Sequence, residues 1–79
     1  MSRDAIKTAF VEKIAETLEI TTDEVDTAKT WDDLEAYSID VVHIVATLSR
    51  ELGILVPREK FEALRVVDDF IDVFVAYQD

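Results

Sequence analysis

The chain contains no cysteine, one histidine, one glycine and one proline in 79 residues. Without cysteine it forms no disulfide, and a single histidine leaves too few ligands for a structural zinc site. The near absence of glycine and proline predicts helices joined by few tight turns. No apolar run is long enough to cross a bilayer, so we expect no membrane insertion. The first residues do not resemble a signal peptide, which predicts a cytoplasmic location.

Basic residues are also scarce, with eight lysines and arginines against 18 acidic residues and a net charge of −10. A surface of this sign repels the phosphates of nucleic acid and the headgroups of anionic membranes. It attracts partner proteins with basic patches through electrostatic steering. Disorder is excluded because 49% of the residues are hydrophobic and regularly spaced. The length fits one domain spanning residues 1–79, which we expect to be a monomer.

The apolar spacing predicts three main helices. Residues 3–18 repeat apolar side chains every four positions after a capping serine, Ser2. A second helix runs from Ser38 to Leu52 and ends at Gly53, and a last helix covers residues 67–76. Pro57 begins a short helix ending near Leu64. We therefore predict an all-α fold, a small four-helix bundle of three main helices and one short helix.

Side chains expected in the core follow from the same spacing. The first helix contributes Ile6, Phe10, Ile14 and Leu18, the second Val42, Ile44, Val45, Leu48 and Leu52, and the last Val67, Phe70, Ile71 and Phe74. Residues 26–37 form the longest irregular stretch, which we expect Trp31 and Leu34 to pin to this core.

Ser38 is the most informative residue, because it is a hydroxyl at the start of the second helix. As a catalytic nucleophile it would need a base, but His43 lies about 140° away around the helix. No glycine-rich turn supplies an oxyanion hole, so the sequence does not predict an enzyme. Ser38 is either a helix cap or the point where a prosthetic group is attached.

The order of these elements and the residues around Ser38 resemble the acyl carrier protein family over nearly the whole chain. The family's Asp-Ser-Leu motif corresponds to Tyr37-Ser38-Ile39, preceded by Leu34 and followed by Asp40. Glu24-Val25 and Val56-Pro57 match further family positions. The resemblance implies 4′-phosphopantetheine attached covalently to Ser38. It would supply the thiol that this chain lacks, for carrying acyl thioesters.

Three departures from the family pattern bear on the predicted docking surface. Tyr37 replaces the aspartate that would cap the second helix, and Glu35 replaces a frequent glycine. The acidic row usual on the second helix is interrupted by His43, Thr47, Ser49 and Arg50. The predicted docking residues are Tyr37, Ile39, Asp40, His43, Thr47 and Arg50, with Trp31 at the edge. We expect a specialised carrier, and Phe61 and Phe70 to limit the space for an acyl chain.

The implied partners are a phosphopantetheinyl transferase and the acyl-transferring and chain-extending enzymes, expected to have basic docking patches, of fatty-acid, polyketide or related lipid synthesis. Two alternatives stay open from the sequence. One is a peptidyl or aminoacyl carrier with the same fold. The other is an acidic helical module that binds a basic protein and carries no cofactor.

Overall fold

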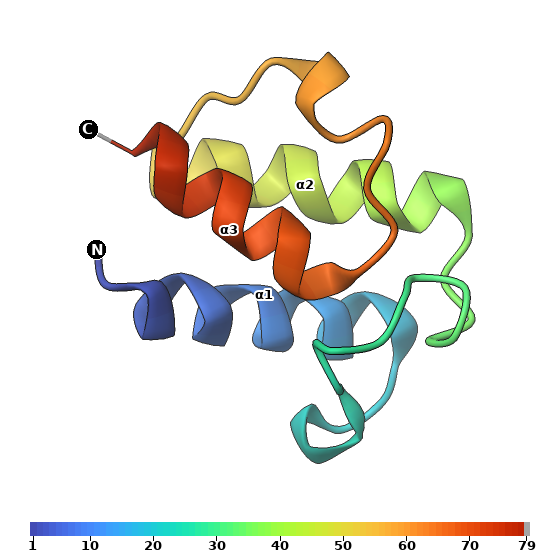
Figure 1. Ribbon diagram of the computed structural model, residues 1–79. Helices are drawn as coiled ribbons and strands as arrows, with labels where there is room; N and C mark the ends of the chain where they lie inside the picture. The colour runs from blue at the N-terminus through green and yellow to red at the C-terminus, as the bar shows by residue number, and fades with distance from the viewer. Residues whose placement is uncertain (79) are drawn as a thin grey trace.

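The computed structural model describes residues 1–78 and contains three α-helices (Figure 1). They are α1 (Arg3–Leu18), α2 (Ser38–Leu52) and α3 (Val67–Tyr77), with 3₁₀ turns η1 (Thr22–Glu24) and η2 (Arg58–Lys60). The described residues form no strand beyond one isolated bridge between Thr30 and Val66. The all-α bundle is confirmed. Its short helix is a single 3₁₀ turn that Pro57 precedes rather than enters.

The ends of α1 follow local sequence signals. The Ser2 hydroxyl accepts a hydrogen bond from the N–H of Ala5 at 3.1 Å, which confirms the predicted N-cap. At the other end the chain reverses through Glu19, whose φ of 58° is in the left-handed region. Ile6, Phe10 and Ile14 are fully buried, so the four-residue spacing identified the core face of this helix correctly.

The rotation of α2 differs from the prediction at one position. Val42 is 63% exposed, whereas Ile44 and Leu48 are buried. The partly buried residues packed against the core from this helix are Val41, Val45 and Leu52. Val41 and Val42 both satisfy a three-to-four-residue spacing, and only packing against the buried core, on the side where α2 contacts α1, selects Val41.

Aromatic side chains fill the centre of the bundle. The Phe61 and Phe70 rings stack with centroids 4.8 Å apart, and Trp31 meets Phe70 edge-on at 5.3 Å. Phe10 and Phe74 make a second edge-on pair at 5.0 Å. Such contacts are worth about 0.5–1.5 kcal/mol each beyond the area they bury. These ring contacts connect Trp31 and Phe61 to α3, and the Phe10–Phe74 pair connects α3 to α1.

The long loop before α2 is held by main-chain hydrogen bonds to the start of α3. The N–H groups of Val67 and Asp68 donate to the carbonyls of Lys29 and Thr27 at 3.0 and 2.9 Å. The Trp31 N–H donates in turn to the Arg65 carbonyl at 3.1 Å. These bonds satisfy donors that every helix N-terminus leaves open. They fix the loop, and with it the position of the first residue of α2.

Exposed ion pairs join α1 to both other helices. Arg3 Nε lies 2.8 Å from Asp72 Oδ1 on α3, and Lys13 Nζ lies 3.2 Å from Glu51 Oε2 on α2. The hydrogen bond to Asp72 raises the pKa of Arg3, and the one to Glu51 raises the pKa of Lys13. The Arg3–Asp72 pair is solvent-exposed and therefore contributes little to stability, whereas the Lys13 side chain of the other pair is only 14% exposed. Among the described helices, none is both long and apolar enough to cross a membrane.

Candidate functional site

The first turn of α2 begins without a capping side chain on the residue that precedes it. Tyr37 is the N-cap, with φ −79° and ψ 161°, and its side chain makes no cap hydrogen bond. Its main-chain N–H instead donates to Asp40 Oδ2 at 3.0 Å. Asp40 therefore supplies the reciprocal half of a capping box, and its carboxylate also faces the positive end of the helix dipole.

Ser38 is the first residue of α2 and its side chain is exposed. Within residues 1–78 its hydroxyl takes part in no hydrogen bond, so it does not act as the helix cap. The main-chain N–H groups of Ser38 and Ile39 likewise donate to no group of the described chain. A free hydroxyl beside open N–H donors at a helix N-terminus suits an esterified phosphate.

A tight turn over residues 31–36 directs the chain into α2. The Ala36 N–H donates to the Trp31 carbonyl at 3.0 Å, and the Glu35 N–H donates to the Asp32 carbonyl at the same distance. Glu35 has a φ of 60°, a left-handed conformation that usually favours glycine. Thr30 caps this turn, because its Oγ1 accepts a hydrogen bond from the Asp33 N–H at 3.1 Å. The turn sets the direction in which Ser38 leaves the loop.

The structure brings the proposed docking residues to one end and one side of α2. Tyr37 and Ile39 are each 77% exposed, and His43 and Arg50 are also exposed. Asp40 and Thr47 are partly buried. Trp31 was expected at the edge of this surface, which is wrong: it is 6% exposed and packs on Phe70. Its indole N–H has no partner within the described chain.

The sequence missed Val42 as a surface residue. It is 63% exposed on the turn of α2 that follows Ser38. Because it is apolar and fits the helical spacing, the sequence predicts it among the core residues. No signal in the sequence shows that Val41, and not Val42, faces the core.

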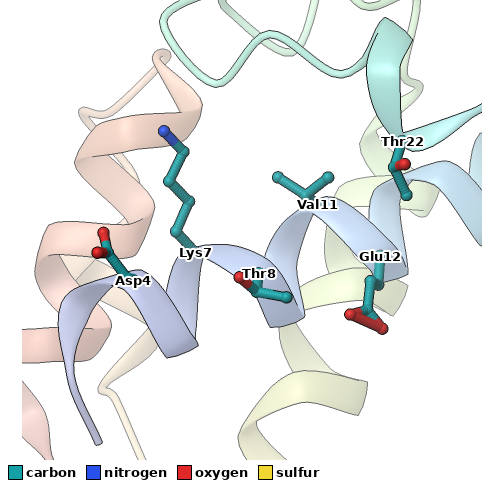
Figure 2. Close-up of a pocket in the computed structure, with 6 residues that line it drawn as sticks. All are labelled: Asp4, Lys7, Thr8, Val11, Glu12 and Thr22. Carbon is teal, nitrogen blue, oxygen red and sulfur yellow. The ribbon is translucent and has the colours of Figure 1, made fainter.

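Two shallow hollows open on the surface of the described residues. One, of about 350 Å³, is lined by Asp32, Glu35, Ala36 and Tyr37 and adjoins Ser38 in the chain. The other, of about 320 Å³, is lined by side chains of α1 and by Thr22 of η1, which Figure 2 shows beside the helix. Neither enters the aromatic core, where Phe61 and Phe70 stack. No group of three or more potential metal ligands occurs in the described part of the chain.

Comparison with known proteins gives the class of the site. The family model described as "Phosphopantetheine attachment site" matches residues 8–74. An acyl carrier protein of Clostridium perfringens is 32% identical over 69 residues, which cover 86% of this chain and 91% of the relative. Acyl carrier proteins of Acidothermus cellulolyticus and Rubrobacter xylanophilus are each 30% identical, over 91% and 99% of this chain and 87% and 98% of theirs.

The chain therefore belongs to the family of phosphopantetheine-bearing acyl carrier proteins. It is a carrier and not an enzyme, and its cofactor is covalently bound 4′-phosphopantetheine. The start of α2 fits that group, because it offers an exposed hydroxyl and two N–H donors that have no partner within residues 1–78. A phosphate esterified there would also meet the positive end of the helix dipole.

Proposed function

We propose that Ser38 bears the phosphopantetheine group and that the protein carries acyl intermediates for enzymes of fatty-acid, polyketide or related lipid synthesis. The observation that supports this most directly is the exposed Ser38 hydroxyl at the start of α2, within the matched residues 8–74. The bound group supplies a thiol, and hence a thioester, to a chain that has no cysteine.

The chain's own residues would hold and present this arm. The N–H groups of Ser38 and Ile39 are open to donate to the phosphate, as helix N-termini do for other anions. Asp40 fixes the first turn by accepting from the Tyr37 N–H, so the attachment point does not fray. The proposed partners are a phosphopantetheinyl transferase and the enzymes that load, extend and remove the acyl group. We place the protein in the cytoplasm as a monomer.

Intact-mass measurement after co-expression with a broad-specificity phosphopantetheinyl transferase tests the attachment site. We expect the wild type to gain the mass of one phosphopantetheine group and Ser38→Ala to gain none. Because the Ser38 hydroxyl makes no hydrogen bond in the described chain, Ser38→Ala should retain the circular dichroism spectrum and melting temperature of the unmodified wild type.

Ser49→Ala, which removes another hydroxyl from α2, is the matched control and should load normally. If Ser38→Ala still gained the mass of the group, another residue would be the attachment site. A wild type that no transferase modifies would leave the cofactor-free interaction module as the better explanation. Transfer of aminoacyl groups in preference to fatty acyl groups onto the loaded arm would indicate the aminoacyl carrier.

A further inference from the structure

The exposed side of α2 has an unusual composition for so acidic a chain. Its solvent-facing positions past Ser38 follow the helical spacing along one stripe about 100° wide. They are Ile39, Val42, His43, Ala46 and Arg50. Three of these side chains are apolar, one is a histidine and one is cationic. We call these five residues the α2 stripe.

The two carboxylates near the α2 stripe are already engaged. Asp40 accepts from the Tyr37 N–H at 3.0 Å, and Glu51 accepts from Lys13 Nζ at 3.2 Å on the flank that faces α1. No carboxylate therefore projects from the α2 stripe itself. The negative charge beside Ser38 lies on the other side, in the loop, where Asp32, Asp33 and Glu35 are exposed and make no ion pair with described residues.

The surface around Ser38 is thus divided. An acidic hollow of about 350 Å³, which Tyr37 helps to line, lies toward the loop. An apolar side with Arg50 at its far end lies along α2. A partner that reaches Ser38 covers both halves, because the α2 stripe begins one residue beyond it. Exposed aromatic and arginine side chains of this kind frequently anchor protein interfaces.

From this division we propose that α2 docks into an apolar groove of its partner enzyme, bordered by a carboxylate that pairs with Arg50, while basic side chains of the partner meet only the loop acids. The proposal rests on the carrier function above. It follows from charge complementarity, since basic groups opposite the α2 stripe would face Arg50 and His43. The nearest carboxylates, Asp40 and Glu51, lie beside the stripe and already accept hydrogen bonds. The net negative charge alone would predict basic partner side chains over the whole surface. The proposal instead restricts these contacts to the acidic residues of the loop.

The test uses a ketosynthase of a fatty-acid synthase whose carrier-docking patch is basic, together with the same enzyme after its patch Lys and Arg residues are changed to Glu. Carriers are loaded at Ser38 with one acyl group and checked by intact mass before use, so failure to load counts against the proposed function alone. The measured quantity is kcat/KM for acyl transfer at low salt.

We expect the His43→Glu/Arg50→Glu carrier to be at least about tenfold better than the wild type with the basic enzyme, and the order to reverse with the acidic enzyme. Arg50→Glu alone should move the rate in the same sense by a smaller factor. Lys7→Glu, which changes the net charge by the same amount as Arg50→Glu but lies on α1, is the matched control and should leave both rates unchanged.

The apolar half is tested separately with Val42→Asn, a neutral substitution at an exposed position that does not disturb the core. It should lower kcat/KM with both enzymes. The proposal is overturned if the wild type matches the doubly substituted carrier on the basic enzyme, if the order does not reverse on the acidic one, or if Val42→Asn has no effect on either.

Discussion

At the start of α2, residues other than Ser38 form the helix cap. The N-cap position is taken by Tyr37, and the carboxylate of Asp40 accepts from the Tyr37 N–H, so the Ser38 hydroxyl makes no hydrogen bond within residues 1–78. A serine at the N-cap itself would direct its oxygen back to the main chain, as Ser2 does at the start of α1. A shift of one position along the chain thus separates a capping hydroxyl from one available for modification.

Glu35 offers a test at the residue scale, because its φ of 60° costs a side chain with a Cβ about 1 kcal/mol or more. We expect Glu35→Gly to raise the free energy of unfolding by about 0.5–1 kcal/mol, after the greater flexibility of glycine in the unfolded chain is subtracted. Urea unfolding followed by circular dichroism measures it.

Glu35→Ala is the control for this prediction. It removes the same negative charge but keeps the Cβ, so it should not reproduce the gain. If alanine and glycine stabilise equally, charge rather than backbone conformation is responsible.

At the scale of elements, helix ends decide how the site is presented. The start of α3 is capped by main-chain carbonyls of a loop some forty residues earlier, at Lys29 and Thr27. The start of α2 depends on Asp40, which lies inside the same turn. In α2 the Ile39 N–H has no partner in the described chain. An N-cap side chain with an acceptor oxygen could accept a hydrogen bond from it.

Tyr37→Asp should therefore stabilise the unmodified protein by about 1 kcal/mol, because an aspartate at the N-cap accepts from the second or third N–H of the helix. Little packing is lost, since the tyrosine is 77% exposed. Thermal unfolding of the apo protein is the measurement. Tyr37→Ala, which removes the ring and adds no acceptor, should show no such gain, and equal stability of the two variants would contradict the capping argument.

The whole molecule is small and strongly charged. It extends over 31 × 24 × 20 Å and has a net charge of −10. At about 0.01 M salt the Debye length is about 30 Å, so every surface charge acts on every other, whereas at about 0.1 M it is near 10 Å. Only four of its acidic residues, Glu16, Glu51, Asp68 and Asp72, form ion pairs within residues 1–78.

Raising NaCl from about 10 to 300 mM should thus stabilise the protein, because relief of repulsion exceeds the loss from weak surface ion pairs. We expect the melting temperature to rise by about 4–8 °C, the shift that corresponds to about 1 kcal/mol in a domain of this size. A variant with Asp32→Asn, Asp33→Asn and Glu35→Gln, which has three fewer negative charges, should respond less. A flat or falling melting temperature would show that repulsion does not limit stability.

The sequence by itself determined the three helices, most of their buried faces and the serine at the start of α2. It could do so because caps, periodicity and short motifs are local signals, as Ser2, Ile6, Phe10, Ile14 and Gly53 illustrate. Tertiary structure alone decided which of Val41 and Val42 faces the core, since both fit the helical period and only packing against the buried core distinguishes them. It likewise buried Trp31 and tied the long loop to α3 through main-chain bonds, which leave no side-chain pattern to read.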